Sequence, residues 1–97
     1  MCQPPKAIDG AKVIEFAGID AEVAPTDAAT HRVGGEVIGP AAGLAIAQYD
    51  GADSFYLFYC DPAWQTLTDT WHPTIESARQ QAEFEYRGVS SRWQRLA

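Results

Sequence analysis

The chain of 97 residues has a net charge of −6, and 46% of its residues are hydrophobic. These values are typical of one globular domain and exclude a disordered chain. Between Arg32 and Arg79 there is no Lys or Arg, so the central half of the chain would repel phosphate. We therefore expect no nucleic acid and no anionic membrane as partner, whereas a basic protein remains compatible.

The cysteines and histidines do not predict a metal site or a cofactor. Cys2 and Cys60 lack the spacing of a disulfide framework or a metal motif, and His31 and His72 have no closely spaced co-ligands. No apolar run reaches the about 18 residues of a transmembrane helix. The N-terminus also lacks the basic and then apolar pattern of a signal peptide, so we expect a cytoplasmic protein.

The N-terminal part divides into a tail and a region of short strands. Residues 1–11 contain two adjacent prolines and few apolar residues, which predicts a flexible tail. We assign 12–38 to N-terminal strands and a loop, because β-branched residues over 12–19 favour a strand. Gly34-Gly35 within the later apolar segment indicates a bulge or a bend.

Residues 43–71 predict a three-stranded antiparallel meander. Its central segment, 55–60, has six apolar or aromatic residues in succession, so both faces of this strand should be buried. An Asp-Gly turn signal precedes the segment and an Asp-Pro signal follows it. The third strand alternates, with Asp69 and Trp71 on one face and threonines on the other.

A helix is predicted over 74–87, between Thr74 as the N-cap and Gly88. Its stripe of small residues, including Ala78 and Ala82, should pack closely on the central strand. The fold class is therefore α+β in a single domain. We expect an antiparallel meander sheet of three to five strands, with one main C-terminal helix packed on one face.

Two surfaces of this fold are left open by the sequence. Phe84 lies opposite the apolar stripe of the helix, so it is either exposed or covered; we expect residues 89–93 of the C-terminal segment 89–97 to turn back and place Trp93 against it. The helix can cover only one face of strand 55–60. The other face must be covered by segments 13–19 and 33–38, or by a second molecule; if the chain leaves it bare, it is a binding surface.

Three motifs support a resemblance to other proteins: FYLFYCD at 55–61, TDTWH at 68–72 and QAEFEY at 81–86. Through them the region 43–93 resembles small stand-alone bacterial proteins of unassigned activity, which often have a late Trp such as Trp93. The resemblance implies a bacterial domain and supplies no catalytic residues. The order of meander and helix is also similar to antitoxin-like and double-stranded-RNA-binding folds, although the acidic centre contradicts the second.

The preferred functional hypothesis is a protein-interaction module, either immunity-like or homodimer-forming. Aromatic anchors dominate the energetics of interfaces, and Asp69 is the least easily explained carboxylate. The candidate binding residues are Tyr49, Tyr56, Trp64, Asp69 and Trp93. The structural alternative is that the aromatic residues belong to the core and that Asp69 caps the strand-to-helix turn.

The alternative function is a small hydrolase or transferase. In it, Cys60 would be the nucleophile and His72 the base, oriented by Asp61 or Asp69, of which Asp69 is preferred. Cys60 and His72 flank the same strand pair, which allows proximity. No family-type signature surrounds Cys60, so the sequence assigns no catalytic residue and the interaction hypothesis is preferred.

Overall fold

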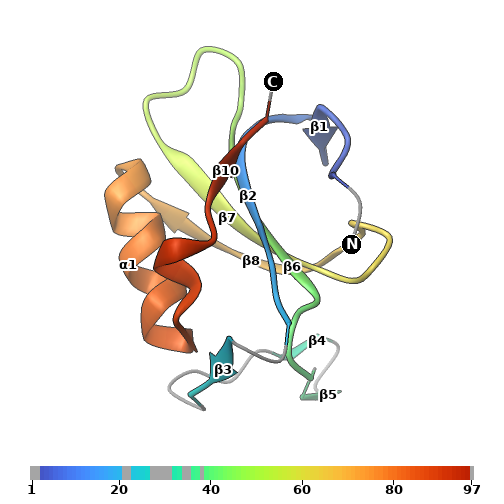
Figure 1. The fold of residues 1–97 in the computed structure, drawn as a ribbon. Coiled ribbons are helices and arrows are strands. Elements are labelled where there is room, and N and C mark those ends of the chain that lie inside the picture. The colour runs from blue at the N-terminus through green and yellow to red at the C-terminus, as the bar shows by residue number, and fades with distance from the viewer. Residues whose placement is uncertain (1–2, 21–22, 27–31, 34–35, 38, 97) are drawn as a thin grey trace.

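In a computed structural model of the chain, an antiparallel sheet carries one main helix on one face (Figure 1). The structure describes residues 3–20, 23–26, 32–33, 36–37 and 39–96. Within them the sheet has six strands: β1 (Ala7–Ile8), β2 (Ala11–Gly18), β6 (Gly43–Gln48), β7 (Phe55–Cys60), β8 (Thr66–His72) and β10 (Gln94–Arg95). The predicted α+β class is confirmed. Gly34-Gly35 and Ile38 lie outside the described residues.

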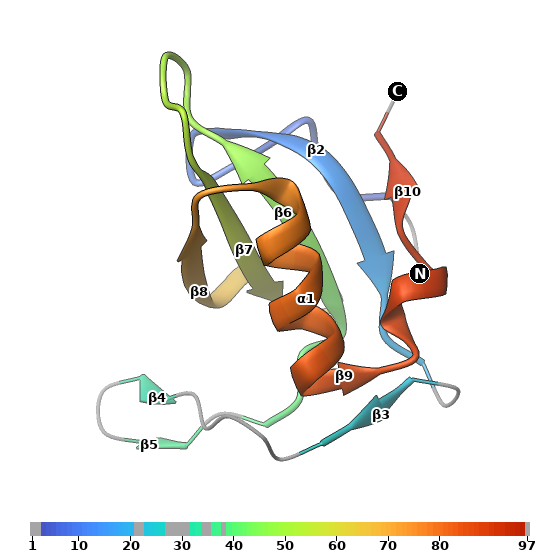
Figure 2. The ribbon, with the colours of Figure 1, turned by 90° about the vertical axis from the view of Figure 1, so that its left-hand side faces the viewer.

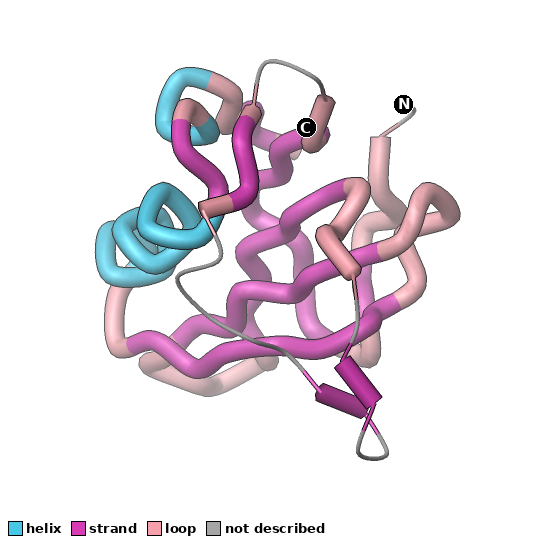
Figure 3. The backbone as a smooth tube through the Cα atoms, turned by 90° about the horizontal axis from the view of Figure 1, so that it is seen from below, coloured by secondary structure: helices cyan, strands magenta, loops and turns pink. Residues whose placement is uncertain are grey.

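The remaining elements are short, apart from the main helix α1 (Ile75–Glu85). Strand β3 (Ala24–Pro25) pairs with β9 (Tyr86–Arg87), and β4 (Arg32–Val33) pairs with β5 (Glu36–Val37). The 3-10 helix η1 (Val89–Ser91) follows β9. Figure 3 shows both helices on one side of the curled strands.

The sheet order is β1-β2-β6-β7-β8, and β10 also pairs with β2 (Figure 2). Because β6 occupies one edge of β2, β1 and β10 share the other edge. The backbone N–H of Val13 donates to Lys6 O at 2.9 Å, and that of Leu96 donates to Ile14 O at 3.0 Å. The two ends of the chain thus cover the edge of β2 in succession, and β8 forms the opposite edge of the sheet.

Both faces of β7 are buried within the chain from Leu57 to Cys60, as its uninterrupted apolar sequence predicts, whereas Phe55 and Tyr56 at its start are partly buried. Alternate side chains along each strand enter two clusters. The helix-side core contains Ala17, Val23, Ala41, Leu44, Ile46, Leu57, Tyr59, Ala78, Ala82, Tyr86 and Val89. The outer core, on the other face, contains Ile8, Ala11, Val13, Phe16, Ala45, Ala47, Phe58, Cys60 and Trp64. A second molecule is therefore not needed to cover the outer face of β7.

The predicted tail over 1–11 is wrong for its second half. Ala7–Ile8 form β1, and Ile8 is buried in the outer core. The chain reverses at Asp9 and Gly10, with φ values of 50° and 83°. An Asp-Gly pair with both φ values positive is the turn that joins closely paired strands. The prolines in this stretch directed the prediction towards a tail, although Asp-Gly was a hairpin signal.

The predicted contact between Phe84 and Trp93 is also wrong. Phe84 is exposed on α1, whereas Trp93 packs against the helix-side core. The chain turns at Gly88, which has a φ of 97°, and the Glu83 carboxylate accepts hydrogen bonds from the N–H groups of Gly88 and Ser90 at 2.9 and 3.0 Å. These bonds direct the segment after α1 towards β2, away from Phe84.

Helix α1 begins as predicted and ends slightly earlier than expected. Thr74 is the N-cap, since its Oγ1 accepts a hydrogen bond from Ser77 N at 3.0 Å. The helix ends at Glu85 because Tyr86 and Arg87 leave it to pair with β3. Ala78 and Ala82 are fully buried, as their place on the small-residue stripe predicts.

Candidate functional site

Three large hydrophobic side chains are exposed on the described surface: Tyr49 (37%), Trp71 (56%) and Phe84 (59%). Tyr49 and Trp71 both adjoin Tyr56. The Tyr49 and Tyr56 rings form an edge-to-face pair with centroids 5.5 Å apart, and Tyr56 and Trp71 are direct cross-strand partners. Cross-strand partners face the same side of a sheet. Tyr49, Tyr56, Trp71 and the neighbouring Asp69 therefore form a surface that we call the outer aromatic patch.

Two rings of the outer aromatic patch, those of Tyr49 and Tyr56, are held in place by neighbouring groups. Tyr56 stacks on buried Phe58 with ring centroids 6.0 Å apart and planes at 22°. The Tyr49 hydroxyl donates a hydrogen bond to Asp9 O at 3.1 Å, which anchors this ring to the β1–β2 turn. Side chains that are ordered before binding lose less conformational entropy when a partner docks. The Tyr49 and Tyr56 rings are therefore preorganised, and Trp71 lies exposed beside Tyr56.

Asp69 adds a carboxylate to this surface. It is the cross-strand partner of Phe58 and lies two residues before Trp71 on β8, so it shares their face of the sheet. Its side chain is exposed and makes no hydrogen bond or ion pair with the described residues. The expected capping role does not apply to Asp69, because Thr74 caps the helix.

Trp64 is a core residue. Its φ of 62° turns the side chain onto the outer core, where it is buried and meets the Phe16 ring edge-to-face at 6.0 Å. The Asp61 carboxylate fixes this turn by accepting hydrogen bonds from Ala63 N and Gln65 N, both at 2.9 Å. Trp64 therefore supports the outer face from within.

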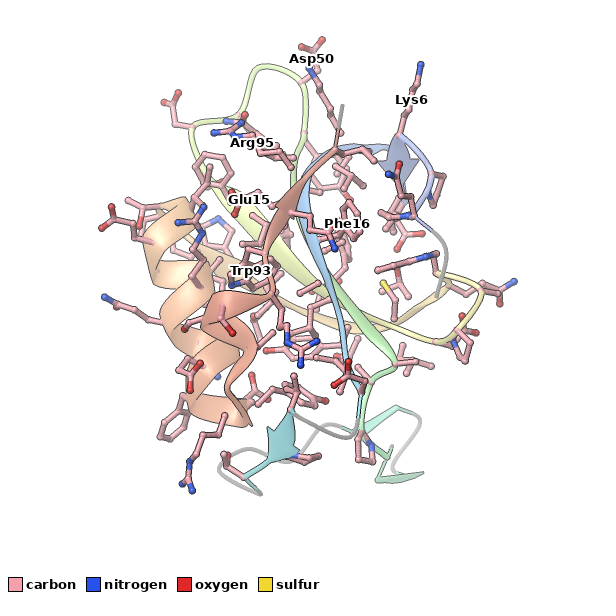
Figure 4. All side chains as sticks on the ribbon, viewed as in Figure 1. Lys6, Glu15, Phe16, Asp50, Trp93 and Arg95 are labelled. Carbon is pink, nitrogen blue, oxygen red and sulfur yellow. The ribbon has the colours of Figure 1, made fainter. Side chains whose placement is uncertain are left out.

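Trp93 lies on the other side of the sheet from the outer aromatic patch. It packs against the helix-side core, and its buried Nε1 has no hydrogen-bond partner among the described residues (Figure 4). Of the five candidate binding residues, the structure thus brings together Tyr49, Tyr56 and Asp69. It adds Trp71, which is exposed beside Tyr56 and was not among the candidate binding residues.

The structure does not bring Cys60, His72 and Asp69 together. Cys60 and His72 lie at opposite ends of the β7–β8 pair, because His72 is the partner of Phe55 at the start of β7. Five strand residues separate these ends by about 17 Å. The two side chains also occupy opposite faces, since Cys60 belongs to the outer core and His72 faces α1. They cannot share a proton.

The Cys60 environment also opposes nucleophilic chemistry. Burial raises the pKa of the Cys60 thiol to about 12, and the carboxylates of Asp61 and Asp9 add to this effect. A thiol with such a pKa is protonated at neutral pH, whereas the thiolate is the nucleophile. Cys60 is a small apolar residue of the outer core.

A chain of polar side chains lies between α1 and strands β7 and β8, and the sequence analysis missed it. His72 contacts Ser77 Oγ through Nδ1 at 3.1 Å and Thr70 Oγ1 through Nε2 at 2.8 Å. Further along, the Tyr59 hydroxyl donates to the buried carboxylate of Glu85. The alternation of β8 had placed the threonines on the face of this network. Mutually satisfied buried polar groups fix how a helix docks on a sheet.

Protein-family models, curated sequences and solved structures give no match to the chain. The resemblance of region 43–93 to small bacterial proteins therefore stays a prediction. Within the described residues, no three His, Cys, Asp or Glu side chains are grouped as metal ligands would be, and no helix is long and apolar enough to cross a membrane.

The surroundings of the outer aromatic patch are acidic. The three strands β6, β7 and β8 and their two connections contain no Lys or Arg, but they contain Asp50, Asp53, Asp61 and Asp69. Asp50 directly follows Tyr49, at the tip of the β6–β7 connection, and Lys6 extends away from the sheet above β1 (Figure 4). The patch therefore combines exposed aromatic rings with a negative field.

Proposed function

We propose that the chain is a protein-interaction module that binds a partner with a basic surface through the outer aromatic patch. The observation that carries this proposal is the grouping of exposed Tyr49 and Trp71 around the partly buried Tyr56 on one face of the sheet. Aromatic side chains are enriched among the residues that contribute most to protein–protein binding. An exposed indole such as Trp71 costs solubility, and binding a partner would remove it from water.

The charge of the chain favours a basic partner over a second copy. Each copy has a net charge of −6, so two copies repel each other at long range. Two β8 edges paired around Asp69 would place two carboxylates opposite each other, which destabilises a strand pair. A basic protein would instead be attracted and correctly oriented by the same charges. An immunity-like protein that blocks a basic toxin would have these properties.

The experiment compares the binding of wild-type protein, Trp71→Ala and Phe84→Ala. Phe84 is the matched control, because it is an equally exposed aromatic residue on α1 and outside the patch. Each tagged protein is incubated with lysate of the source cells, and the captured proteins are quantified by mass spectrometry. Light scattering of each purified protein gives its oligomeric state.

We expect a basic protein to be retained by wild type and Phe84→Ala and lost with Trp71→Ala. Its purified form should bind wild type directly, and binding should weaken with added salt because the long-range attraction is screened. Equal retention by Trp71→Ala would contradict the proposal. The proposal would also be contradicted if wild type and Phe84→Ala form a stable dimer and Trp71→Ala does not, since the patch would then bind a second copy.

A further inference from the structure

A groove of about 400 Å³ lies between the start of α1, β2, the end of the chain around β10, the end of β6 and the start of β7. It shares no residue with the outer aromatic patch. Its apolar lining consists of the buried Val13 and the partly buried Ile14, Phe55, Ile75 and Leu96. Apolar side chains in a concave, open site are a typical lining of small-molecule sites.

The groove lies where three features meet: a register shift in β2, a change of partner along the edge of β2, and the start of α1. The β2–β6 pairing shifts register between Val13 and Glu15, so Ile14 is an additional residue in β2. Hydrogen bonding on the outer edge of β2 passes from the segment before β1 to β10 at Val13 and Ile14. Helix α1 begins only at Ile75 and covers β7 and β8 from there. Apolar surface near Ile14 is therefore left open.

Two cations line the groove, Lys12 and Arg95. Both are exposed, and neither forms an ion pair with the described residues. Arg79, by contrast, binds Glu15. No Asp or Glu is among the groove's lining residues, although the chain as a whole carries −6. Arg95 projects from β10 at the end of the sheet where the β6–β7 connection lies (Figure 4).

We infer that this groove binds a small amphipathic carboxylate. The apolar part of the ligand lies along Ile14, Phe55 and Ile75, and its carboxylate is bound by Lys12 and Arg95. The volume is within the about 300–1,000 Å³ of small-molecule sites. Eight residues line the groove, fewer than the about 20–30 that each partner contributes to a stable protein interface. Arg95 can bind a carboxylate through two N–H groups, whereas Lys12 adds a point charge.

The test is a titration with decanoate, followed by NMR of the Ile methyl groups. Decyltrimethylammonium, which has the same tail and a cationic head, is the control ligand. The variants are Lys12→Gln, Arg95→Gln and the double variant, with Lys6→Gln as the matched control, because Lys6 is an exposed lysine that does not line the groove. Circular dichroism verifies that each variant is folded. These surface changes remove charge without opening the core.

We expect decanoate to shift the methyl signals of Ile14 and Ile75, with weaker effects from the cationic ligand. Each single charge removal should weaken decanoate binding about threefold, as for exposed ion pairs, and the double variant about tenfold. Lys6→Gln should bind as wild type does. The inference is overturned if decanoate leaves these methyl groups unshifted, if the cationic ligand binds equally well, or if the double variant keeps wild-type affinity.

Discussion

Glu15 and Arg79 form a two-point ion pair between β2 and α1, although they are 64 residues apart in the chain. Arg79 donates from Nε to Glu15 Oε1 at 2.9 Å and from Nη2 to Oε2. The Glu15 side chain is almost fully buried, whereas that of Arg79 is 42% exposed. The register shift at Ile14 turns Glu15 to the helix side, because Val13 and Phe16 both face the outer core. The register shift therefore buries the Glu15 carboxylate, and Arg79 supplies the cation that pairs with it.

Replacing Arg79 with Ala should lower the free energy of unfolding by about 2 kcal/mol, since it leaves a buried carboxylate without its cation. Arg87→Ala is the control, because Arg87 is an exposed arginine just after α1 with no ion pair among the described residues. It should change stability by less than about 0.5 kcal/mol. Urea unfolding gives both values. Equal effects of the two variants would show that the Glu15–Arg79 pair does not stabilise the fold.

Gly10→Ala should destabilise the β1–β2 hairpin by about 1 kcal/mol. Gly10 has a φ of 83°, and an added Cβ would meet the Tyr49 ring at an ordinary 3.7 Å, so the cost comes from the backbone and not from a clash. The measurement is amide hydrogen exchange, which should become faster at Val13, the residue that donates to Lys6 O. Unchanged protection of Val13 would mean that residues 6–10 are not held as the structure shows.

The sequence predicted the parts of the fold that follow from local pattern. The continuous apolar run of β7 required burial of both faces, and Thr74 marked the start of α1; the structure confirms both. The register shift at Ile14 could not be predicted, because a single additional residue leaves no distinct pattern in an apolar strand. As a result, the sequence did not predict the burial of Glu15 or its ion pair with Arg79 either.

Glu83→Gln should destabilise the segment after α1 by about 1 kcal/mol, because the weaker amide acceptor replaces a carboxylate that binds two backbone N–H groups. The hydrogen bond from Gly88 lowers the pKa of Glu83 most, with help from Ser90. The stabilisation is therefore full above the ordinary pKa of a glutamate and is lost as the pH falls through the lower native value.

Urea unfolding of Glu83→Gln at neutral and at acidic pH tests this expectation. The difference in the free energy of unfolding between wild type and Glu83→Gln should decrease to zero on acidification. Gln80→Ala is the control, since Gln80 is exposed on the same helix. A gap that stays constant down to acidic pH would assign the effect to something other than the Glu83 carboxylate.

His72→Gln should make stability less dependent on pH between about pH 7 and pH 5. Burial lowers the pKa of His72 from 6.5, although the Glu85 carboxylate opposes this effect. The unfolded chain then binds a proton before the native chain does, so the His72 contribution is full above about pH 6.5 and is lost on acidification. Wild type should therefore lose more stability than His72→Gln in this range. Parallel pH profiles would contradict the burial of a neutral His72.

The candidate site was only partly predictable. Tyr49, Tyr56 and Asp69 were named as separate candidates, and the structure places them on one face of the sheet; whether they bind a partner stays a prediction. Trp64 was misjudged because its positive φ, which no residue type announces, folds it into the outer core. Trp71 was missed because alternation alone does not say whether its face of β8 is core or surface. In the structure the outer core is fully buried around Phe58 but only partly covers the neighbouring Tyr56, so Trp71 beside Tyr56 is exposed.

The most direct measurement for the outer aromatic patch is photo-crosslinking in the source cells. A photo-reactive benzoylphenylalanine replaces Trp71 in one protein and Phe84 in another, since both positions are highly exposed. The account predicts that position 71 crosslinks to a basic protein and that position 84 does not. Crosslinks of the same protein from both positions, or crosslinks from position 71 only to a second copy of this chain, would contradict it.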